Sequence, residues 1–581
     1  MSAVLNKVDV LVVGSGNAGF AAAISAAQSG ADRVLLIDKC PEEWAGGNTY
    51  FTAGAYRTAH AGLQDLLPIV NNVTREQAQK IDLAPYTPQD FMADLRKTCL
   101  GRSDPHLAKT LIEDSNSAVK WLAGQGIRFQ LSFNRQAYEV DGRIKFWGGL
   151  SIKTQDGGKG LIADYRAAAR RHGVQLSWST TLRGIQTDPL DGSSIVTVQV
   201  DGQEQTIHAG AVILAAGGFE ANPRMRSQFL GPGWDVAMVR GTPYNTGDVL
   251  ELAIQQLGAE PVGNWSGCHS VAWDANADPN TGDRVASNEF TKSGYPLGLM
   301  FNVEGRRFVD EGIDLRNYTY AKFGRAILAQ PEQIAFQVWD VQTAPWLRAE
   351  EYRPERVEHI TADTLEELAD RCGARGLQNK EAFLHTLREY NEAVYAHRRE
   401  NPSAKWDPAV RDGLSTQSST QKLALAKSNW ALPLDQGPYL AIKVTCGITF
   451  TFGGLKVDAR TAQLLAASTG QPIPGVYCVG EMMGGLFYSN YPGGSGLTSG
   501  AVFGRRAGKA AAAAARAGAR GGKQTQVIIP ARGPLAVHTD CHSLALGNMA
   551  EDRVCSSRTK PSRDQPASLG LESSGMCTGT V

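Results

Sequence analysis

The sequence predicts an α/β fold in which a central parallel sheet carries an antiparallel excursion and is interrupted by an inserted domain. Three observations predict this class. An apolar strand, a glycine turn and an alanine-rich helix follow one another between Val8 and Ser29. Glycine-punctuated strands recur at 212–218 and 473–481, and charged helix-forming windows replace them between 268 and 433. The chain has 581 residues, too many for one hydrophobic core, so two or three domains are expected.

The first element is a βαβ unit with strands at 8–13 and 33–37 on either side of a helix at 18–29. The turn between strand and helix reads G-x-G-x-x-G. Its first glycine permits a tight turn, its second lets a pyrophosphate approach the backbone, and its third packs the helix on the strand. The helix N-terminus offers N–H groups to phosphates. We therefore predict a dinucleotide bound by Gly14, Gly16, Asn17, Ala18 and Gly19.

Further glycine-rich strand ends extend this site. Asp38 closes the second strand, where a carboxylate can bind a ribose hydroxyl. The strand that ends at Glu481 supplies a carboxylate suited to ribityl hydroxyls. Four such strand ends imply one extended dinucleotide across a single sheet, which favours FAD over NAD. The other predicted cofactor residues here are Lys39, Gly46, Gly47, Asn48, Thr49, Ala216 and Gly217.

The later elements define the domains. Strands at 175–178, 195–200 and 211–214 are expected to form the antiparallel excursion. A helix at 498–516 closes the ordered part of the chain. We predict an FAD-binding domain from 1–265 and 436–520, an inserted domain at 266–435, and a disordered tail at 521–581.

Composition excludes several functions. With 58 basic and 58 acidic residues the net charge is zero, which gives no field for nucleic acid or an anionic membrane. No apolar run approaches the roughly 20 residues of a transmembrane helix, and no signal peptide precedes the first strand. The nine cysteines are scattered without a CxxC pair, so no metal site is expected and a reducing, cytoplasmic location is favoured.

The motifs GSGNAG, GGNT, ILAAGGFE, TPYNTGD, EGRRFVDE, GVYCVGE and YPGGSG occur in that order over about residues 8 to 515. In these motifs the chain resembles the fumarate reductase/succinate dehydrogenase flavoprotein family. Segments such as GGNTYFTAGAYR and TCGITFTFGG resemble its tricarballylate dehydrogenase subgroup. The resemblance implies a Rossmann-like FAD-binding domain with an inserted α+β capping domain that closes over the flavin.

The resemblance also assigns cofactor contacts. Asp248 should lie near the flavin site, and Glu481 should bind the ribityl chain. The start of the last helix, Ser495, Gly496 and Leu497, should present N–H groups to the flavin's pyrimidine end, where a helix N-terminus stabilises negative charge. The GGNT loop has no histidine, the residue to which succinate dehydrogenases attach FAD. Non-covalent FAD is therefore expected.

For catalysis, the resemblance implies that Arg316 transfers a proton while hydride passes between a substrate carbon and flavin N5. A guanidinium stays protonated in water, so Arg316 needs a relay. Nearby residues that could supply one are Asp310, Glu311, Asp314, Tyr318 and Tyr320, among which the sequence does not choose.

Two substrate anchors differ from the fumarate reductase pattern. Phe450 and Tyr491 stand where that group has a histidine and an arginine, so fumarate or succinate is not the expected substrate. His269 resembles a carboxylate-binding histidine of the capping region, and Arg57 could face the pocket. Tyr491 also resembles a tyrosine of 3-ketosteroid Δ1-dehydrogenases that polarises a ketone.

These observations leave three hypotheses. The first is an FAD enzyme that oxidises a C–C bond next to a carboxylate or carbonyl, with tricarballylate to aconitate as its leading case. The second is the same chemistry on an apolar ketone, and the third is an FAD-binding protein of low activity. The substrate is a small molecule. Because the chain has no cluster or haem motif, the electron acceptor would be a quinone, O₂ or a partner redox protein.

Overall fold

The computed structural model describes residues 6–140, 142–408 and 410–521. The tail predicted for 521–581 lies outside the described residues, apart from Gly521, which ends the last helix. Within these ranges the strands form an eight-stranded sheet, a six-stranded sheet and two three-stranded sheets. The two large sheets contain the elements that build the site.

The eight-stranded sheet has a parallel centre with the strand order β9, β2, β1, β12 and β20. Val13 of β1 is level with Leu214 of β12, and Leu214 is level with Cys478 of β20. The glycine turns that follow these three strands therefore meet at one edge of the sheet. The strands are β1 (Lys7–Val13), β2 (Val34–Ile37), β9 (Gln175–Ser177), β12 (Gln203–Leu214) and β20 (Pro472–Cys478).

The antiparallel excursion differs from the one that the sequence predicts, because the expected strand at 211–214 pairs in parallel with β1. It consists of β10 (Thr180–Thr187), β11 (Ser194–Val200) and the first half of β12. The segment at 175–177 was expected in this excursion, but it is β9 and pairs in parallel with β2. The reason is the helix α7 (Gly157–Arg171) before it, which makes β9 the end of a crossover connection. A short strand, β19 (Gln463–Leu465), pairs with β20 in the antiparallel direction.

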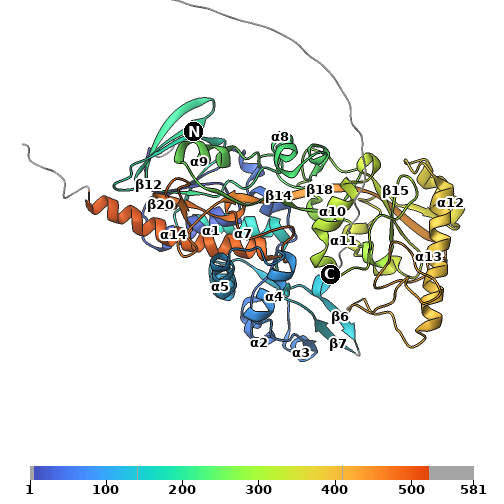
Figure 1. The fold of residues 1–581 in the computed structure, drawn as a ribbon. Helices are drawn as coiled ribbons and strands as arrows, with labels where there is room; N and C mark the ends of the chain where they lie inside the picture. Colours follow the sequence, from blue (N-terminus) through green and yellow to red (C-terminus); the bar gives the residue numbers. More distant parts are fainter. Residues whose placement is uncertain (1–5, 141, 409, 522–581) are drawn as a thin grey trace, which may run out of the picture. The chain divides into compact units, whose positions relative to one another are not determined.

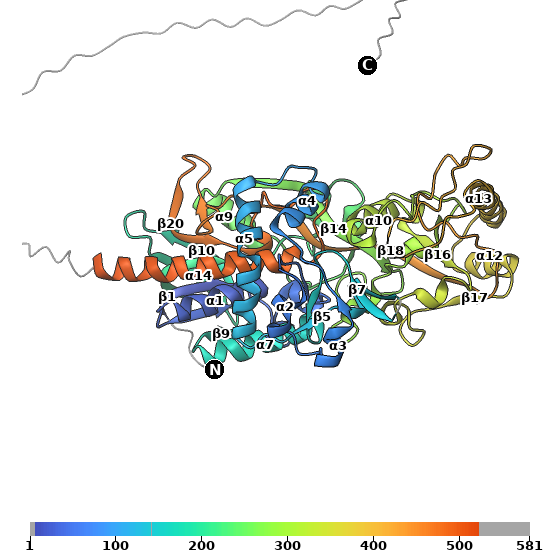
Figure 2. The same ribbon diagram turned by 90° about the horizontal axis from the view of Figure 1, so that it is seen from below.

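The first and last helices pack directly on each other. α1 (Asn17–Gln28) and α14 (Ser495–Gly521) lie side by side in both views (Figures 1 and 2). Glycines one turn apart on α14, at 500, 504 and 508, allow this approach. A Cβ at Gly508 would lie 2.2 Å from the carbonyl oxygen of Ala22. Both helices begin at the sheet edge where the glycine turns meet.

The six-stranded sheet joins strands of the predicted insert, 266–435, to strands on both sides of it, since β13 and β18 lie outside that range. Its longest strands, β14 and β18, pair antiparallel from Pro261 opposite Leu455 to Asp274 opposite Val444. Helices α12 (Leu365–Gly373) and α13 (Lys380–Glu400) lie at its far end, away from α1 and α14 (Figures 1 and 2). The strands are β13 (Met238–Val239), β14 (Pro261–Asp274), β15 (Leu299–Asn302), β16 (Ala335–Trp339), β17 (Ile360–Ala362) and β18 (Tyr439–Leu455).

Other helices cover the two sheets. The helix α4 begins with a capping box between Thr87 and Asp90 and has proline in its first turn. None of the helices that the structure describes is both long and apolar enough to cross a membrane. The remaining longer helices are α4 (Pro88–Thr98), α5 (Pro105–Gly124), α9 (Asp248–Leu257) and α10 (Tyr320–Leu328).

Candidate functional site

A cavity of about 1920 Å³, including its opening to solvent, lies where the glycine turns of β1, β12 and β20 meet. Gly19, Gly46 and Ser495 of the predicted cofactor set do not line it. The predicted residues that do are Gly14, Gly16, Asn17, Ala18, Asp38, Lys39, Gly47, Asn48, Thr49, Ala216, Gly217, Asp248, Glu481, Gly496 and Leu497. The structure therefore gathers motifs from both ends of the chain around one cavity.

The first glycine turn has the shape that a pyrophosphate needs. Gly14 has φ +110°, and a Cβ there would lie 2.3 Å from the carbonyl oxygen of Ala215. A Cβ on Gly19 would lie 1.9 Å from the carbonyl oxygen of Gly14, so this glycine packs the helix on the turn. A Cβ on Gly16 meets nothing closer than 3.7 Å. Gly16 thus leaves space on the cavity side for phosphates at the N-terminus of α1.

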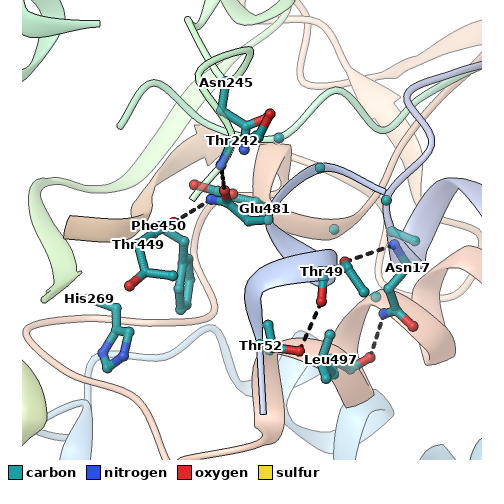
Figure 3. A pocket seen from close by; sticks show the side chains of 18 of the residues that line it. Asn17, Thr49, Thr52, Thr242, Asn245, His269, Thr449, Phe450, Glu481 and Leu497 are labelled. Atoms are coloured by element: carbon teal, nitrogen blue, oxygen red, sulfur yellow. Dashed lines mark hydrogen bonds between the residues drawn. The ribbon is translucent and has the colours of Figure 1, made fainter. Parts of the chain in front are cut away.

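Side chains hold this turn in place. Asp38 Oδ2 accepts hydrogen bonds from the Ser15 N–H at 2.8 Å and the Ser15 hydroxyl at 2.6 Å. Asn17 ties three segments together: its N–H donates to Thr49 Oγ1 at 3.0 Å, and its Nδ2 donates to Leu497 O at 2.8 Å. Figure 3 shows Asn17, Thr49 and Leu497 on one side of the cavity. The N-termini of α1 and α14 are thereby fixed relative to each other.

Asp248 lies next to the end of β2. Its Oδ1 accepts from Lys39 Nζ at 2.6 Å, and Lys39 also donates to Thr246 Oγ1 at 2.6 Å. Lys39 follows Asp38, the residue expected to bind a ribose. The structure thus places Asp248 beside the Asp38 turn.

Two carboxyl groups, those of Glu481 and Glu220, lie close together next to Gly218. Glu481 Oε1 accepts from the Thr451 N–H at 2.7 Å, and buried Glu220 accepts from Asn245 Nδ2 at 2.6 Å. Burial and the nearby Glu220 carboxyl raise the pKa of Glu481 well above its ordinary value. Burial raises the pKa of Glu220 to about 7. The sequence predicts Glu481 but not its partner Glu220.

The other end of the cavity is aromatic. The His269 ring lies 4.9 Å from the Tyr491 ring centroid and 6.0 Å from those of Phe450 and Tyr320. Figure 3 shows His269 and Phe450 together on this side. The buried His269 Nδ1 has no hydrogen-bond partner among the described residues. Burial and the charge of Arg240 lower the pKa of His269 well below its usual value, so its imidazole is neutral.

Arg240 is the cationic residue at this end, and it belongs to none of the sequence motifs. Its Nη1 donates to Thr449 Oγ1 at 2.9 Å, and its Nη2 donates to Asn288 Oδ1. Its guanidinium also lies 5.6 Å from the Trp273 ring centroid. The available signal was its position, directly after the short strand β13 and before the TPYNTGD motif.

Three other predicted site residues lie outside the cavity lining. Arg57 is fully buried and bonds to Asp94, Tyr86 and the carbonyl of Gly493. The Tyr318 hydroxyl donates to Asp94 at 3.1 Å. Arg316 lies in the same segment, and its carbonyl accepts from Thr319. Tyr320 is the member of this segment that lines the cavity.

Comparison with known proteins gives a consistent picture. The model of a family described as FAD binding domain matches residues 9–497. The chain is 30% identical to the fumarate reductase (cytochrome) of Shewanella frigidimarina over 518 residues, which cover 87% of this chain and 77% of that protein. It is 26% identical to the urocanate reductase of Eggerthella lenta, over 86% and 74% of the two chains. The open conformation of a flavocytochrome c3 fumarate reductase superposes with a TM-score of 0.64 at 25% identity, over 88% and 79%.

Proposed function

We propose a substrate class for this chain, which belongs to the FAD binding domain family and is an FAD-dependent oxidoreductase acting on carbon–carbon bonds. Fumarate reductase flavoproteins are among its relatives. The substrate is a carboxylate with a flat, apolar body, and the bond that reacts lies beside the carboxylate. When bound, FAD accepts or supplies the hydride at flavin N5. The FAD is held without a covalent bond, since the segment 46–50 offers no histidine.

The observation that carries this proposal is the pairing of Arg240 with an aromatic wall. A planar guanidinium suits a carboxylate, because it can donate two parallel hydrogen bonds. The rings of Phe450 and Tyr491 lie 5.0 Å apart and meet edge to face, which makes an aromatic wall beside neutral His269. A substrate with one charged end and one apolar, aromatic end matches both features.

This end of the cavity is less suited to tricarballylate and to a 3-ketosteroid, the two substrates that the sequence suggested. Of the described residues that line the cavity, Arg240 and Lys39 are the only arginine and lysine, and Lys39 is paired with Asp248. Tricarballylate would bring three carboxylates to this single arginine. A 3-ketosteroid is uncharged and would not use the guanidinium of Arg240, although the Tyr491 hydroxyl suits a ketone. Among the relatives, urocanate reductase acts on a carboxylate with a flat ring.

We propose that residues 314–320 of the inserted domain, here called the cap segment, carry out proton transfer. The family resemblance points to Arg316, whereas Tyr320 lines the cavity 6.0 Å from the His269 ring. We propose Arg316 as the proton-transfer residue and Tyr320 as its relay to the substrate. The Tyr320 hydroxyl then delivers the proton on the cavity side.

A panel of oxidants tests the substrate class. The holoenzyme is reduced chemically without O₂ and mixed with 3-phenylpropenoate, aconitate or a 1,4-diene-3-ketosteroid, while the flavin band is followed. We expect the phenylpropenoate to restore the oxidised band fastest. If aconitate restores the oxidised flavin band fastest, the substrate is tricarballylate. If the steroid restores it fastest, the substrate is a ketone.

A further inference from the structure

Asp94, on α4, contacts two different parts of the chain through its two carboxylate oxygens. Oδ2 accepts from Arg57 Nη1 at 2.5 Å and from the Tyr86 hydroxyl at 2.7 Å. Oδ1 accepts from the Tyr318 hydroxyl at 3.1 Å. Arg57 and Tyr86 belong to the N-terminal part of the chain, whereas Tyr318 belongs to the inserted part. Asp94 is therefore a bridge between the two parts.

On one side the bridge holds the loop that carries Tyr491. Arg57 is fully buried, and its Nε donates to the carbonyl of Gly493 at 2.9 Å. The carbonyl of Arg57 accepts from Thr498 Oγ1 at 2.7 Å, one turn into α14. Tyr491 and Gly493 both line the cavity. The ion pair with Asp94 keeps a buried guanidinium charge neutralised while it fixes this loop.

On the other side the bridge holds the cap segment 314–320. Asn490 Nδ2 donates to the carbonyl of Tyr318 at 2.7 Å, so this segment also touches the Tyr491 loop directly. Lys97, one turn after Asp94 on α4, forms an ion pair with Asp314 at 2.6 Å and lies 4.4 Å from the Tyr318 ring centroid. Four contacts thus fasten the segment that carries Arg316 and Tyr320.

We propose that Asp94 is a positioning residue that sets the distance between the two walls of the substrate end. One wall is the Tyr491 loop, held through Arg57, and the other is the segment 314–320, held through Tyr318. Asp94 does not line the cavity. This inference rests on the proposed function only in placing the substrate between the two walls.

Tyr318→Phe tests the bridge, because it removes one hydroxyl and keeps the ring beside Lys97. Hydrogen–deuterium exchange of residues 314–320 is measured in the holoenzyme without substrate. Tyr395→Phe is the matched control, since its hydroxyl donates to Asp435 at 2.5 Å elsewhere in the cap. We expect faster exchange of 314–320 in Tyr318→Phe and none of this change in Tyr395→Phe. Unchanged exchange in Tyr318→Phe overturns the proposal, whatever the substrate is.

Kinetics with the substrate found in the oxidant panel give the second readout. Losing one hydrogen bond should lower kcat/KM by about three- to tenfold in Tyr318→Phe, with the bound-flavin spectrum unchanged. Faster exchange with unchanged kcat/KM would show a contact that does not position the walls, and would also overturn the proposal. If no compound in the panel reacts, the substrate class fails while the exchange result still decides the bridge. Asp94→Asn should give faster hydrogen–deuterium exchange in residues 490–494 as well as in residues 314–320.

Discussion

The imidazole of His269 meets the ring of Tyr491 edge to face, with 4.9 Å between the ring centroids. His269 comes from β14 in the inserted part, and Tyr491 from the loop before α14. The proposed substrate end of the cavity is thus built between two parts of the chain. Several of its ionisable groups are buried, so pH should affect them.

His269 should make stability depend on pH. Its folded pKa is lowered, so below the ordinary value of 6.5 the unfolded chain binds a proton that the folded protein excludes. The contribution is present above about pH 6.5 and is lost as the pH falls towards the folded pKa. Urea unfolding should show that His269→Gln abolishes a loss of about 1.4 kcal/mol per pH unit in this window. The exposed His385→Gln should keep that loss, and equal slopes in all three proteins would refute the assignment.

The Glu220 carboxyl should change the pH dependence of stability in the opposite direction to His269. Its folded pKa is raised from 4.5 to about 7, so the folded protein keeps a proton that the unfolded chain releases. The stabilisation is present below pH 4.5 and is lost as the pH rises through about 7. Glu220→Gln should therefore flatten the decline in unfolding free energy between pH 5 and 7, by about 1.4 kcal/mol per unit. Exposed Glu204→Gln serves as the control, and a decline as steep in Glu220→Gln as in the wild type speaks against this origin, since the Glu481 carboxyl contributes a decline of its own.

Substitution of Gly16 should weaken FAD binding, whereas substitution of Gly19 should lower the stability of the fold. Gly16→Val puts a side chain into open space in the cavity, so we expect a folded, colourless protein whose FAD affinity falls about 100-fold or more. Gly19→Val meets the carbonyl of Gly14, so we expect a loss of stability of about 2 kcal/mol or more. Thermal unfolding and flavin titration separate the two outcomes. If Gly16→Val binds FAD normally, the pyrophosphate lies elsewhere.

Proton transfer can be assigned by comparing Arg316→Lys with Tyr320→Phe. Removal of a group that moves the proton should lower the rate of flavin reoxidation by about 10²- to 10⁴-fold and change its solvent isotope effect. Under the relay proposed here, both variants show this loss. A wild-type rate in Arg316→Lys would remove Arg316 from the mechanism, and a wild-type rate in Tyr320→Phe would remove the relay.

Local spacing made the cofactor end predictable. The G-x-G-x-x-G turn and the strand end at Glu481 are each continuous in sequence, and parallel pairing brings them to one edge. The strand at 175–177 was assigned to the wrong sheet region because a three-residue strand does not reveal its pairing direction. Only the preceding helix α7 indicates a parallel crossover.

The substrate end was harder to predict, because its residues meet only in three dimensions. Arg240 follows a two-residue strand and belongs to no recognised motif, so its place beside His269 depends on β14 pairing with β18. Arg57 and Tyr318 were predicted as site residues from their nearness to motifs. Both instead point to Asp94, a residue with no local signature.

The most direct test of the proposed substrate asks whether Arg240 recognises a carboxylate. Chemically reduced wild type and Arg240→Gln are reoxidised with 3-phenylpropenoate and with its uncharged amide, and kcat/KM is measured for each pair. We predict that Arg240→Gln lowers kcat/KM for the acid by about 10- to 100-fold, the range for a lost charge-assisted hydrogen bond, and that it changes the amide by less than about threefold. The exposed Arg183→Gln should change neither. An equal loss for acid and amide, or no loss for the acid, would contradict a carboxylate held by Arg240.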